Sequence, residues 1–320
     1  MKRAKLLQKI DAGILLAAAL GLFAVQALLK PGLPTSADLA IHLYRTLEME
    51  HAWAAGVVVP RWAPNLAFGY GYPLFLFAPP LPYLPPLILH ALGLSLETAF
   101  KLLLILTIEL YAVGMYLLAR DLLRSVPGAL LAAAAFTFAP FALREALLVG
   151  GNVPQYLAIG LFPWALWAAT RAVRSGRWAW TVWAALFFAG VMLSHLFHAF
   201  IFAPVFGLYL LLLTVFNAPQ ILAQPTPARR LWTALRPLLA APLGLLLSAF
   251  FWLPAFIERN ATRAQADIYL QKSPFFIRYP YLPELLAPLQ PLDTRAANPY
   301  IPLTLGVVTL ALAGLGLLAV

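Results

Sequence analysis

Long apolar runs recur along the chain, and they constrain its fold more than any other feature. A run of about 18 apolar residues or more is long enough to span a lipid bilayer as a helix. Eight runs reach or approach that length, at residues 12–29, 97–119, 127–147, 155–172, 178–194, 198–216, 237–257 and 301–320. Hydrophobic residues make up 62% of the chain and charged residues only 11%, which is unlike a soluble domain. The sequence therefore predicts an all-α, polytopic transmembrane helix bundle with about eight spanning helices.

A ninth apolar segment, residues 72–93, differs from the others because it is rich in proline. It contains Pro73, Pro79, Pro80, Pro82, Pro85 and Pro86. Each proline lacks a backbone N–H, and lipid offers no substitute partner for the carbonyl that loses its donor. We expect this segment to lie on, or dip into, the outer membrane surface rather than to cross as a regular helix.

The basic residues between the apolar runs predict how the chain is oriented. If residues 72–93 do not cross, the basic segments 120–124, 171–177 and 228–236 share one side with an N-terminal cluster. That cluster is Lys2, Arg3, Lys5 and Lys9. Positive residues favour the cytoplasmic side, so we expect a multi-pass cell-membrane protein with a cytoplasmic N-terminus. Residues 30–96 and 258–300 would then be two large outer loops of a single transmembrane module, residues 1–320.

Net charge and cysteine content exclude several classes of function. The formal net charge is +10, and in a membrane protein such an excess faces anionic lipid rather than nucleic acid. The chain has no cysteine, which excludes disulfides, thiolate metal sites and a cysteine nucleophile. The last apolar run reaches Val320 without a polar tail, so one interpretation is that the chain is the N-terminal fragment of a longer protein.

A dense group of charges, "SADLAIHLYRTLEMEH" (residues 36–51), follows the first apolar run. Ser36 is a suitable N-cap, and a helix is expected from about residue 37 to residue 55. On that helix Asp38, His42 and Arg45 share one face at helical spacing. They form either a site or the solvated face of an interfacial helix with ordinary ion pairs. The remaining charges, Glu48, Glu50 and His51, are expected to form its solvated end.

The next stretch combines a cation, aromatic rings and flexible turns. Arg61 stands between Pro60 and Trp62, while Gly69 and Gly71 alternate with aromatic residues that include Tyr70 and Tyr72. A stiffly held guanidinium beside aromatic rings suits an anionic ligand with an apolar or sugar part. The alternative is an aromatic belt at the membrane interface, with prolines that end helices.

Further polar residues are expected at the same outer face. They include Asn152, Gln155, His195, His198 and Glu258. Polar groups are costly in lipid and usually face a cavity, so their convergence on one face predicts a site. His195 and His198 are three positions apart and could bind a divalent metal together with Asp38; helix-end hydrogen bonding is the alternative. Glu258 is either a second carboxylate or the partner of Arg259, and Glu109 either pairs with a neighbouring helix or relays protons.

Several motifs resemble a known family. The order "ADLAIHLYR", "GVVVPRW" and "FGYGYPLFLFAPPLPY" resembles the first outer loop of bacterial membrane proteins labelled 6-pyruvoyl-tetrahydropterin-synthase-related. Later segments extend the likeness, namely "GMYLLARDLL", "FAPFALREALLVGGNVPQYLAIGLFPWALWA", "LSHLFHA" and "LSAFFWLPAFIERN". Members of that family are similar to the GT-C superfamily of glycosyltransferases. The chain departs from the pattern at Gly150, Gly151 and Gln155, where the family often has an Arg–Gly pair and a Glu.

The resemblance implies an inverting membrane glycosyltransferase that takes its sugar from a polyprenyl-phosphate donor at the outer face. Asp38 matches the acidic residue that serves such enzymes as general base or metal ligand, the metal being Mg or Mn. Arg61 and Arg45 would hold the phosphate, and residues 72–93 would offer a groove for the lipid. The other expected substrate-binding residues are His42, Trp62, Tyr70, Tyr72, Asn152, Gln155 and Glu258. The alternatives are a transporter or flippase of a lipid-linked or anionic solute, and a catalytically silent scaffold with the same fold.

Overall fold

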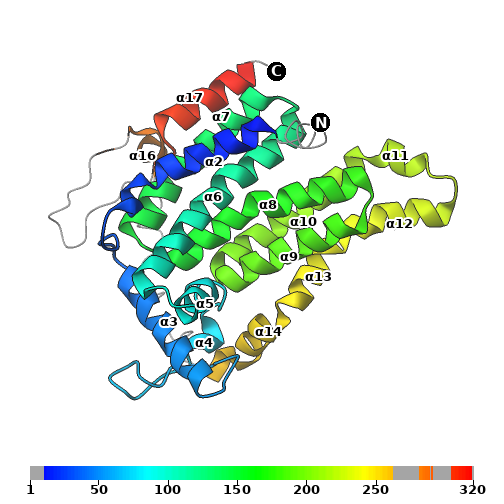
Figure 1. Ribbon diagram of the computed structural model, residues 1–320. Coiled ribbons are helices and arrows are strands. Elements are labelled where there is room, and N and C mark those ends of the chain that lie inside the picture. Colours follow the sequence, from blue (N-terminus) through cyan, green and yellow to red (C-terminus); the bar gives the residue numbers. More distant parts are fainter. Residues whose placement is uncertain (1–10, 262–280, 289, 291–303, 319–320) are drawn as a thin grey trace, which may run out of the picture.

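A computed structural model describes residues 11–261, 281–288, 290 and 304–318 (Figure 1). The N-terminal basic cluster and most of the predicted second outer loop lie outside these residues. Within them every regular element is a helix, and the one extended pairing is an isolated antiparallel bridge between Ala63 and Tyr72. The prediction of an all-α fold is therefore confirmed.

Helices form the body of the molecule (Figure 1). They are α2 (Ala12–Ala24), α6 (Leu96–Leu123), α7 (Val126–Thr137), α8 (Val153–Ser175), α9 (Trp178–Ser194), α10 (Leu196–Phe216) and α17 (Val307–Leu318). The sequence delimits them with ordinary capping signals: Ser95 caps α6, Ser125 caps α7 with Pro127 in its first turn, and Gly176 ends α8 in a left-handed conformation.

The predicted count of about eight membrane spans is not confirmed by the described residues. Three helices of the described residues, α6, α8 and α10, are long and apolar enough to cross a membrane. A fourth crossing results if α12 (Pro227–Leu238) and α13 (Ala240–Leu247), which are bent by 43° at their junction, form one broken span. Two expected runs are interrupted. Residues 127–147 break after α7 and continue as a π-helix, η2 (Phe141–Val149), and residues 237–257 divide into α13 and α14 (Ala249–Ile257).

One end of the bundle carries the first predicted outer loop. There lie η1 (Gln26–Leu29), α3 (Leu39–Ala54), α4 (Leu74–Phe77) and α5 (Leu84–Ala91). The proline-rich segment forms two short helices and no spanning helix, as predicted. It is attached to the bundle where the backbone N–H of Leu81 donates to the carbonyl of Leu193, near the end of α9, over 3.0 Å.

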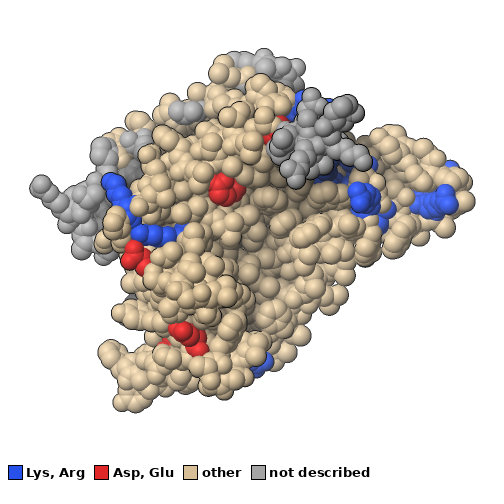
Figure 2. Space-filling view, in the orientation of Figure 1, with Lys and Arg blue, Asp and Glu red and all other residues tan. Residues whose placement is uncertain are grey.

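The opposite end gathers the basic segments. Arg171 lies 3.3 Å from Asp121, Arg174 donates to the Asp121 carbonyl over 2.6 Å, and Arg236 reaches the carbonyl of Ala172 over 3.5 Å. Figure 2 shows Lys and Arg side chains over this region, near α11 (Ala218–Leu222) and α12, and few charges across the middle of the molecule. The three basic segments thus share one end, as the charge argument requires. The remaining short elements are η3 (Glu258–Ala261) and α16 (Leu282–Leu286).

Close helix packing depends on small residues where α13 crosses α9. A Cβ added at Gly244 would lie 2.7 Å from Cδ1 of Phe188 and 2.9 Å from the backbone oxygen of Ala185. Phe188 is 1% exposed and belongs to the largest buried cluster, so it has little room to move. The contact is of the kind that lets membrane helices approach each other closely.

We expect Gly244→Ala to destabilise the bundle by about 1–3 kcal/mol, because overpacking a rigid core forces its neighbours out of position. The measurement is the thermal unfolding temperature of the detergent-purified protein. Gly207→Ala, on α10, is the matched control, since a Cβ there meets nothing within 4 Å. Equal unfolding temperatures for the two variants would contradict the close approach of α13 and α9.

Candidate functional site

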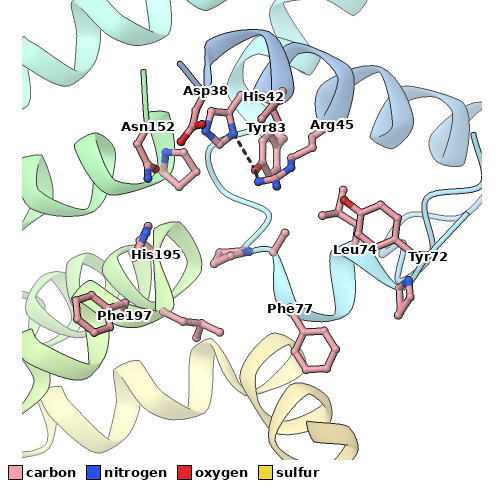
Figure 3. A pocket seen from close by; sticks show the side chains of 16 residues that line it. Asp38, His42, Arg45, Tyr72, Leu74, Phe77, Tyr83, Asn152, His195 and Phe197 are labelled. Carbon is pink, nitrogen blue, oxygen red and sulfur yellow. Dashed lines mark hydrogen bonds between the residues drawn. The ribbon is translucent and has the colours of Figure 1, made fainter. Parts of the chain in front are cut away.

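A pocket of about 670 Å³ opens at the end of the bundle that carries α3, α4 and α5 (Figure 3). Its polar lining consists of Asp38, His42, Arg45, Tyr72, Tyr83, Asn152 and His195. Phe77, Leu196 and Phe197 contribute to an apolar part of the wall. The side chains come from α3 on one side and from the starts of α8 and α10 on the other, so segments far apart in sequence converge on one space.

Asp38 occupies the N-cap position of α3, and the helix starts at Leu39 rather than near residue 37. Ser36 is therefore not the cap, and its hydroxyl is buried without a hydrogen-bond partner in the structure. The carboxylate of Asp38 makes no capping hydrogen bond either. Backbone contacts hold the residue instead, since its N–H donates to the carbonyl of Gly150 over 2.9 Å. The side chain thus remains available to the pocket.

The turn at Gly151 presses closely against the start of α3. Gly151 has a φ of +64°, and a Cβ there would lie 2.2 Å from Ser36 Oγ and 3.0 Å from the backbone nitrogen of Leu39. Only glycine combines this left-handed backbone with so short an approach. Gly151 therefore belongs to the support of Asp38.

Tyr83 joins His42 and Arg45 within the pocket wall. Its hydroxyl lies 3.2 Å from Nδ1 of His42 and accepts a hydrogen bond from Nη1 of Arg45 over 3.3 Å. Burial, together with the charge of Arg45 and with His195, lowers the pKa of His42 to about 3. Burial alone would lower the pKa of the Arg45 guanidinium. Tyr83 and, to a smaller extent, Asp38 act in the opposite direction, so the pKa is raised. The pocket therefore presents a neutral imidazole beside a persistent cation.

His195 and His198 lie at the junction of α9 and α10. Nδ1 of His195 accepts from the backbone N–H of His198 over 3.3 Å and lies 3.1 Å from the Nδ1 of that side chain. Burial and the neighbouring His198 lower the pKa of His195 to about 4. Among the described residues no three His, Cys, Asp or Glu side chains are grouped to hold a metal ion. The structure therefore does not group Asp38, His195 and His198 as metal ligands, and the Nδ1 of His195 serves as a helix cap.

The two low histidine pKa values predict acid sensitivity. In the unfolded chain both imidazoles would take up protons below about pH 6.5, whereas in the folded protein they stay neutral until pH falls towards 4 and 3. The unfolded state binds more protons in that window, so stability should be complete above pH 6.5 and should decrease as pH falls from 6.5 to 4. Thermal unfolding at several pH values measures this, and His42→Asn with His195→Asn should flatten the dependence. The control is His51→Asn, at a side chain that is 63% exposed; an equal flattening there would contradict the assignment.

Arg61 does not share the pocket of Asp38. It forms an ion pair with Glu258 over 3.0 Å, with both side chains substantially exposed, and so links the first loop to the end of α14. It lines a neighbouring apolar pocket of about 270 Å³, to which α4 contributes Phe75 and Leu76. The other residues of α4, Leu74 and Phe77, face the Asp38 pocket, so this helix separates the two spaces.

Other predicted site residues lie apart from Asp38. Trp62 lines a third, shallow pocket with Arg61, and Tyr70 is 86% exposed and lines none of the three. Gln155 lies in the first turn of α8, where its backbone N–H donates to Oδ1 of Asn152 over 3.2 Å. The pocket thus combines six of the predicted residues, namely Asp38, His42, Arg45, Tyr72, Asn152 and His195.

Tyr83 and Glu48 have roles that the sequence analysis missed. Tyr83 stands among prolines, and the only signal for it was that His42 and Arg45 on one helix face require a partner. Glu48 is not part of a solvated helix end: it is 3% exposed and accepts a hydrogen bond from the backbone N–H of Asn65 over 3.1 Å. This contact fixes the loop that follows α3.

Comparison with known proteins identifies a family but no closer relative. Neither the search of curated proteins nor that of solved structures found a match. A family model described as a 6-pyruvoyl-tetrahydropterin synthase related domain of membrane proteins matches residues 75–317. Asn152 and His195 lie within the match, whereas Asp38, His42 and Arg45 precede it. Because the match covers most of the chain, it confirms the family resemblance: the protein belongs to the family of membrane proteins with a 6-pyruvoyl-tetrahydropterin synthase related domain.

Proposed function

We propose that the protein is a GT-C-type glycosyltransferase that takes a sugar from a polyprenyl-phosphate donor at the outer face of the cell membrane. The observation that carries the proposal is that Asp38 and Arg45 line one pocket of about 670 Å³, together with the apolar side chains of Phe77 and Phe197. A carboxylate, a cation and an apolar wall are what a base, a leaving phosphate and a lipid chain require.

In the proposed reaction the acceptor hydroxyl attacks the anomeric carbon of the sugar. Asp38 takes the hydroxyl proton, a new carbon–oxygen bond forms, and the bond between the anomeric carbon and the phosphate oxygen breaks. The electron pair leaves with polyprenyl phosphate, whose charge Arg45 compensates. A single displacement of this kind inverts the configuration at the anomeric carbon. Arg45, rather than Arg61, takes the phosphate-holding role because Arg61 pairs with Glu258 outside this pocket.

The membrane orientation is part of the proposal. The Asp38 pocket and the basic segments lie at opposite ends of the bundle. Positive residues favour the cytoplasm, so a cytoplasmic N-terminus and an outward-facing pocket follow. Residues 1–320 would then act as one transmembrane module. Accessibility of a cysteine introduced at Tyr70 or at Arg230 to a membrane-impermeant reagent tests the two sides separately.

Transfer is tested with the purified protein in lipid nanodiscs. A panel of polyprenyl-phosphate-linked hexoses and pentoses, labelled in the sugar, is supplied with lipid-extract acceptors, and release of polyprenyl phosphate is followed. The proposal expects release that is coupled to a glycosylated product. If no donor is consumed, the protein is not an enzyme of this type.

The second candidate is a transporter of a lipid-linked or anionic solute. It is favoured by Glu109 at the middle of α6, where Oε1 is buried without a hydrogen-bond partner in the structure. However, Glu109 lines none of the three pockets described here, and Arg45 and Arg61 line different ones. Solute flux in proteoliposomes without a glycosylated product would favour this candidate.

A further inference from the structure

The hydrogen bonds around Tyr83 determine which nitrogen of His42 carries the proton. Tyr83 is 1% exposed, and its oxygen accepts from Nη1 of Arg45. The tyrosine hydroxyl must itself donate, and the acceptor that the structure provides is Nδ1 of His42, 3.2 Å away. A neutral imidazole whose Nδ1 accepts carries its proton on Nε2. His42 is 3% exposed, and this Nε2 is buried without a partner in the structure.

His195 reaches the same protonation state by a different route. Its Nδ1 accepts from the backbone N–H of His198, so it too must carry its proton on Nε2. Because this donor is a backbone N–H, the start of α10 fixes the tautomer of His195, and the side chain of His198 is not needed for it. Figure 3 shows His195 on the opposite side of the pocket from His42. Two histidines that carry an N–H donor therefore line one space from two walls.

We propose that His42 and His195 are paired neutral N–H donors that hold oxygen atoms of a single phosphate group in this pocket, and that Tyr83 is a positioning residue that fixes the tautomer of His42. The source of the phosphate as a polyprenyl lipid rests on the proposed function. The donor pair itself does not depend on it.

The charges of the pocket favour phosphate over other ligands. Arg45 supplies one positive charge and Asp38 one negative charge, and the histidines add none because burial keeps them neutral. A sugar alone would leave Arg45 without an anionic partner beyond Asp38. A phosphate group can accept from Arg45 and from both imidazoles, and its several oxygens suit donors that approach from different walls. An unsatisfied buried N–H is costly, so a ligand that accepts from Nε2 of His42 removes that cost.

Nitrogen NMR of the histidine rings tests the tautomers directly. The chain has 5 histidines, so ¹⁵N-imidazole labelling gives a spectrum simple enough to assign by substitution. We expect His42 and His195 to be neutral with the proton on Nε2 at pH 7. Tyr83→Phe should mix the His42 tautomers and leave His195 unchanged. A proton on Nδ1 of His42 in the wild-type protein would overturn the assignment.

Ligand binding is tested in nanodiscs with farnesyl phosphate, inorganic phosphate and farnesol as probes. We expect farnesyl phosphate to move the Nε2–H resonances of His42 and His195, with His51 and His90 as internal references outside this pocket. Farnesol should move neither. An equal response to inorganic phosphate would support the donor pair and assign it to free phosphate. Phosphorus NMR that shows farnesyl phosphate bound, with both Nε2–H resonances unmoved, would overturn the proposal.

Affinity measurements separate the donor role from a structural one. His42→Leu should weaken farnesyl phosphate binding about 10- to 100-fold, the size expected for a lost hydrogen bond to a charged group. His42→Gln, which retains an N–H donor, should recover part of the loss. If His42→Gln and His42→Leu bind equally weakly while both remain folded, the donor role is contradicted. Bound phosphate without sugar transfer would refute the proposed function alone, and transfer without a histidine response would refute this inference alone.

Discussion

Replacing Asp38 by Asn is expected to reduce sugar transfer by about 10²- to 10⁴-fold, the usual contribution of a general base. The amide has almost the same shape but does not accept the proton of the acceptor hydroxyl. The fold should survive, because Asp38 is held by its backbone N–H on Gly150 and its side chain makes no capping hydrogen bond. The measurement is the rate of polyprenyl phosphate release at saturating donor, with the unfolding temperature recorded in parallel.

Glu50→Gln is the matched control for Asp38→Asn. It makes the same chemical change on the same helix, but at a carboxylate that lies 3.8 Å from His90 and outside the Asp38 pocket. We expect Glu50→Gln to transfer sugar at the wild-type rate. Unchanged turnover in Asp38→Asn would remove Asp38 from the mechanism, whereas equal losses in both variants would indicate a general effect of charge on α3.

Gly151→Ala is expected to have the largest structural effect on the site. The new Cβ would lie 2.2 Å from Ser36 Oγ and 2.9 Å from Ser36 Cβ, and the residue would keep a φ of +64° that costs about 1–2 kcal/mol outside glycine. The start of α3 must therefore shift, and Asp38 shifts with it. We expect sugar transfer and phosphate binding to fall at least tenfold, together with a lower unfolding temperature.

Two further variants separate the clash from the backbone strain. Gly56→Ala introduces a comparable strain at a φ of +82°, but a Cβ there meets nothing within 4 Å, so it should lower stability and leave the site intact. Ser36→Gly removes both Ser36 atoms that the new methyl meets. Adding it to Gly151→Ala should recover part of the activity. If Gly56→Ala and Gly151→Ala lose activity equally, or if Ser36→Gly gives no recovery, the proposed role of the contact is contradicted.

The sequence predicted the helices of this protein, whereas the described residues do not confirm the predicted count of about eight membrane spans. The segment 178–194 was predicted with the bounds that α9 has, because a polar or basic residue stands at each end of an uninterrupted apolar run. Residues 237–257 were equally apolar, yet they divide near Ser248, whose hydroxyl donates to the carbonyl of Gly244. Hydropathy measures composition along the chain, and it does not register such a local break.

Helical spacing predicted part of the lining of the candidate pocket and left part of it out. Asp38, His42 and Arg45 line one pocket because they share a face of α3. Arg61 was grouped with them because it is close in sequence, but Glu258, almost two hundred positions later, holds it elsewhere. Tyr83 was missed for the converse reason, since its contact with His42 spans 41 positions. Partners that meet only through the tertiary fold leave no periodic signal.

The short helix α4 has a consequence for how the protein could change its specificity. With Leu74 and Phe77 on the pocket that contains Asp38 and Phe75 and Leu76 on the apolar one, a single helical turn contributes side chains to both pockets. A larger residue on either face displaces a wall that both pockets share. Variation at these four positions would therefore alter both pockets together rather than one at a time.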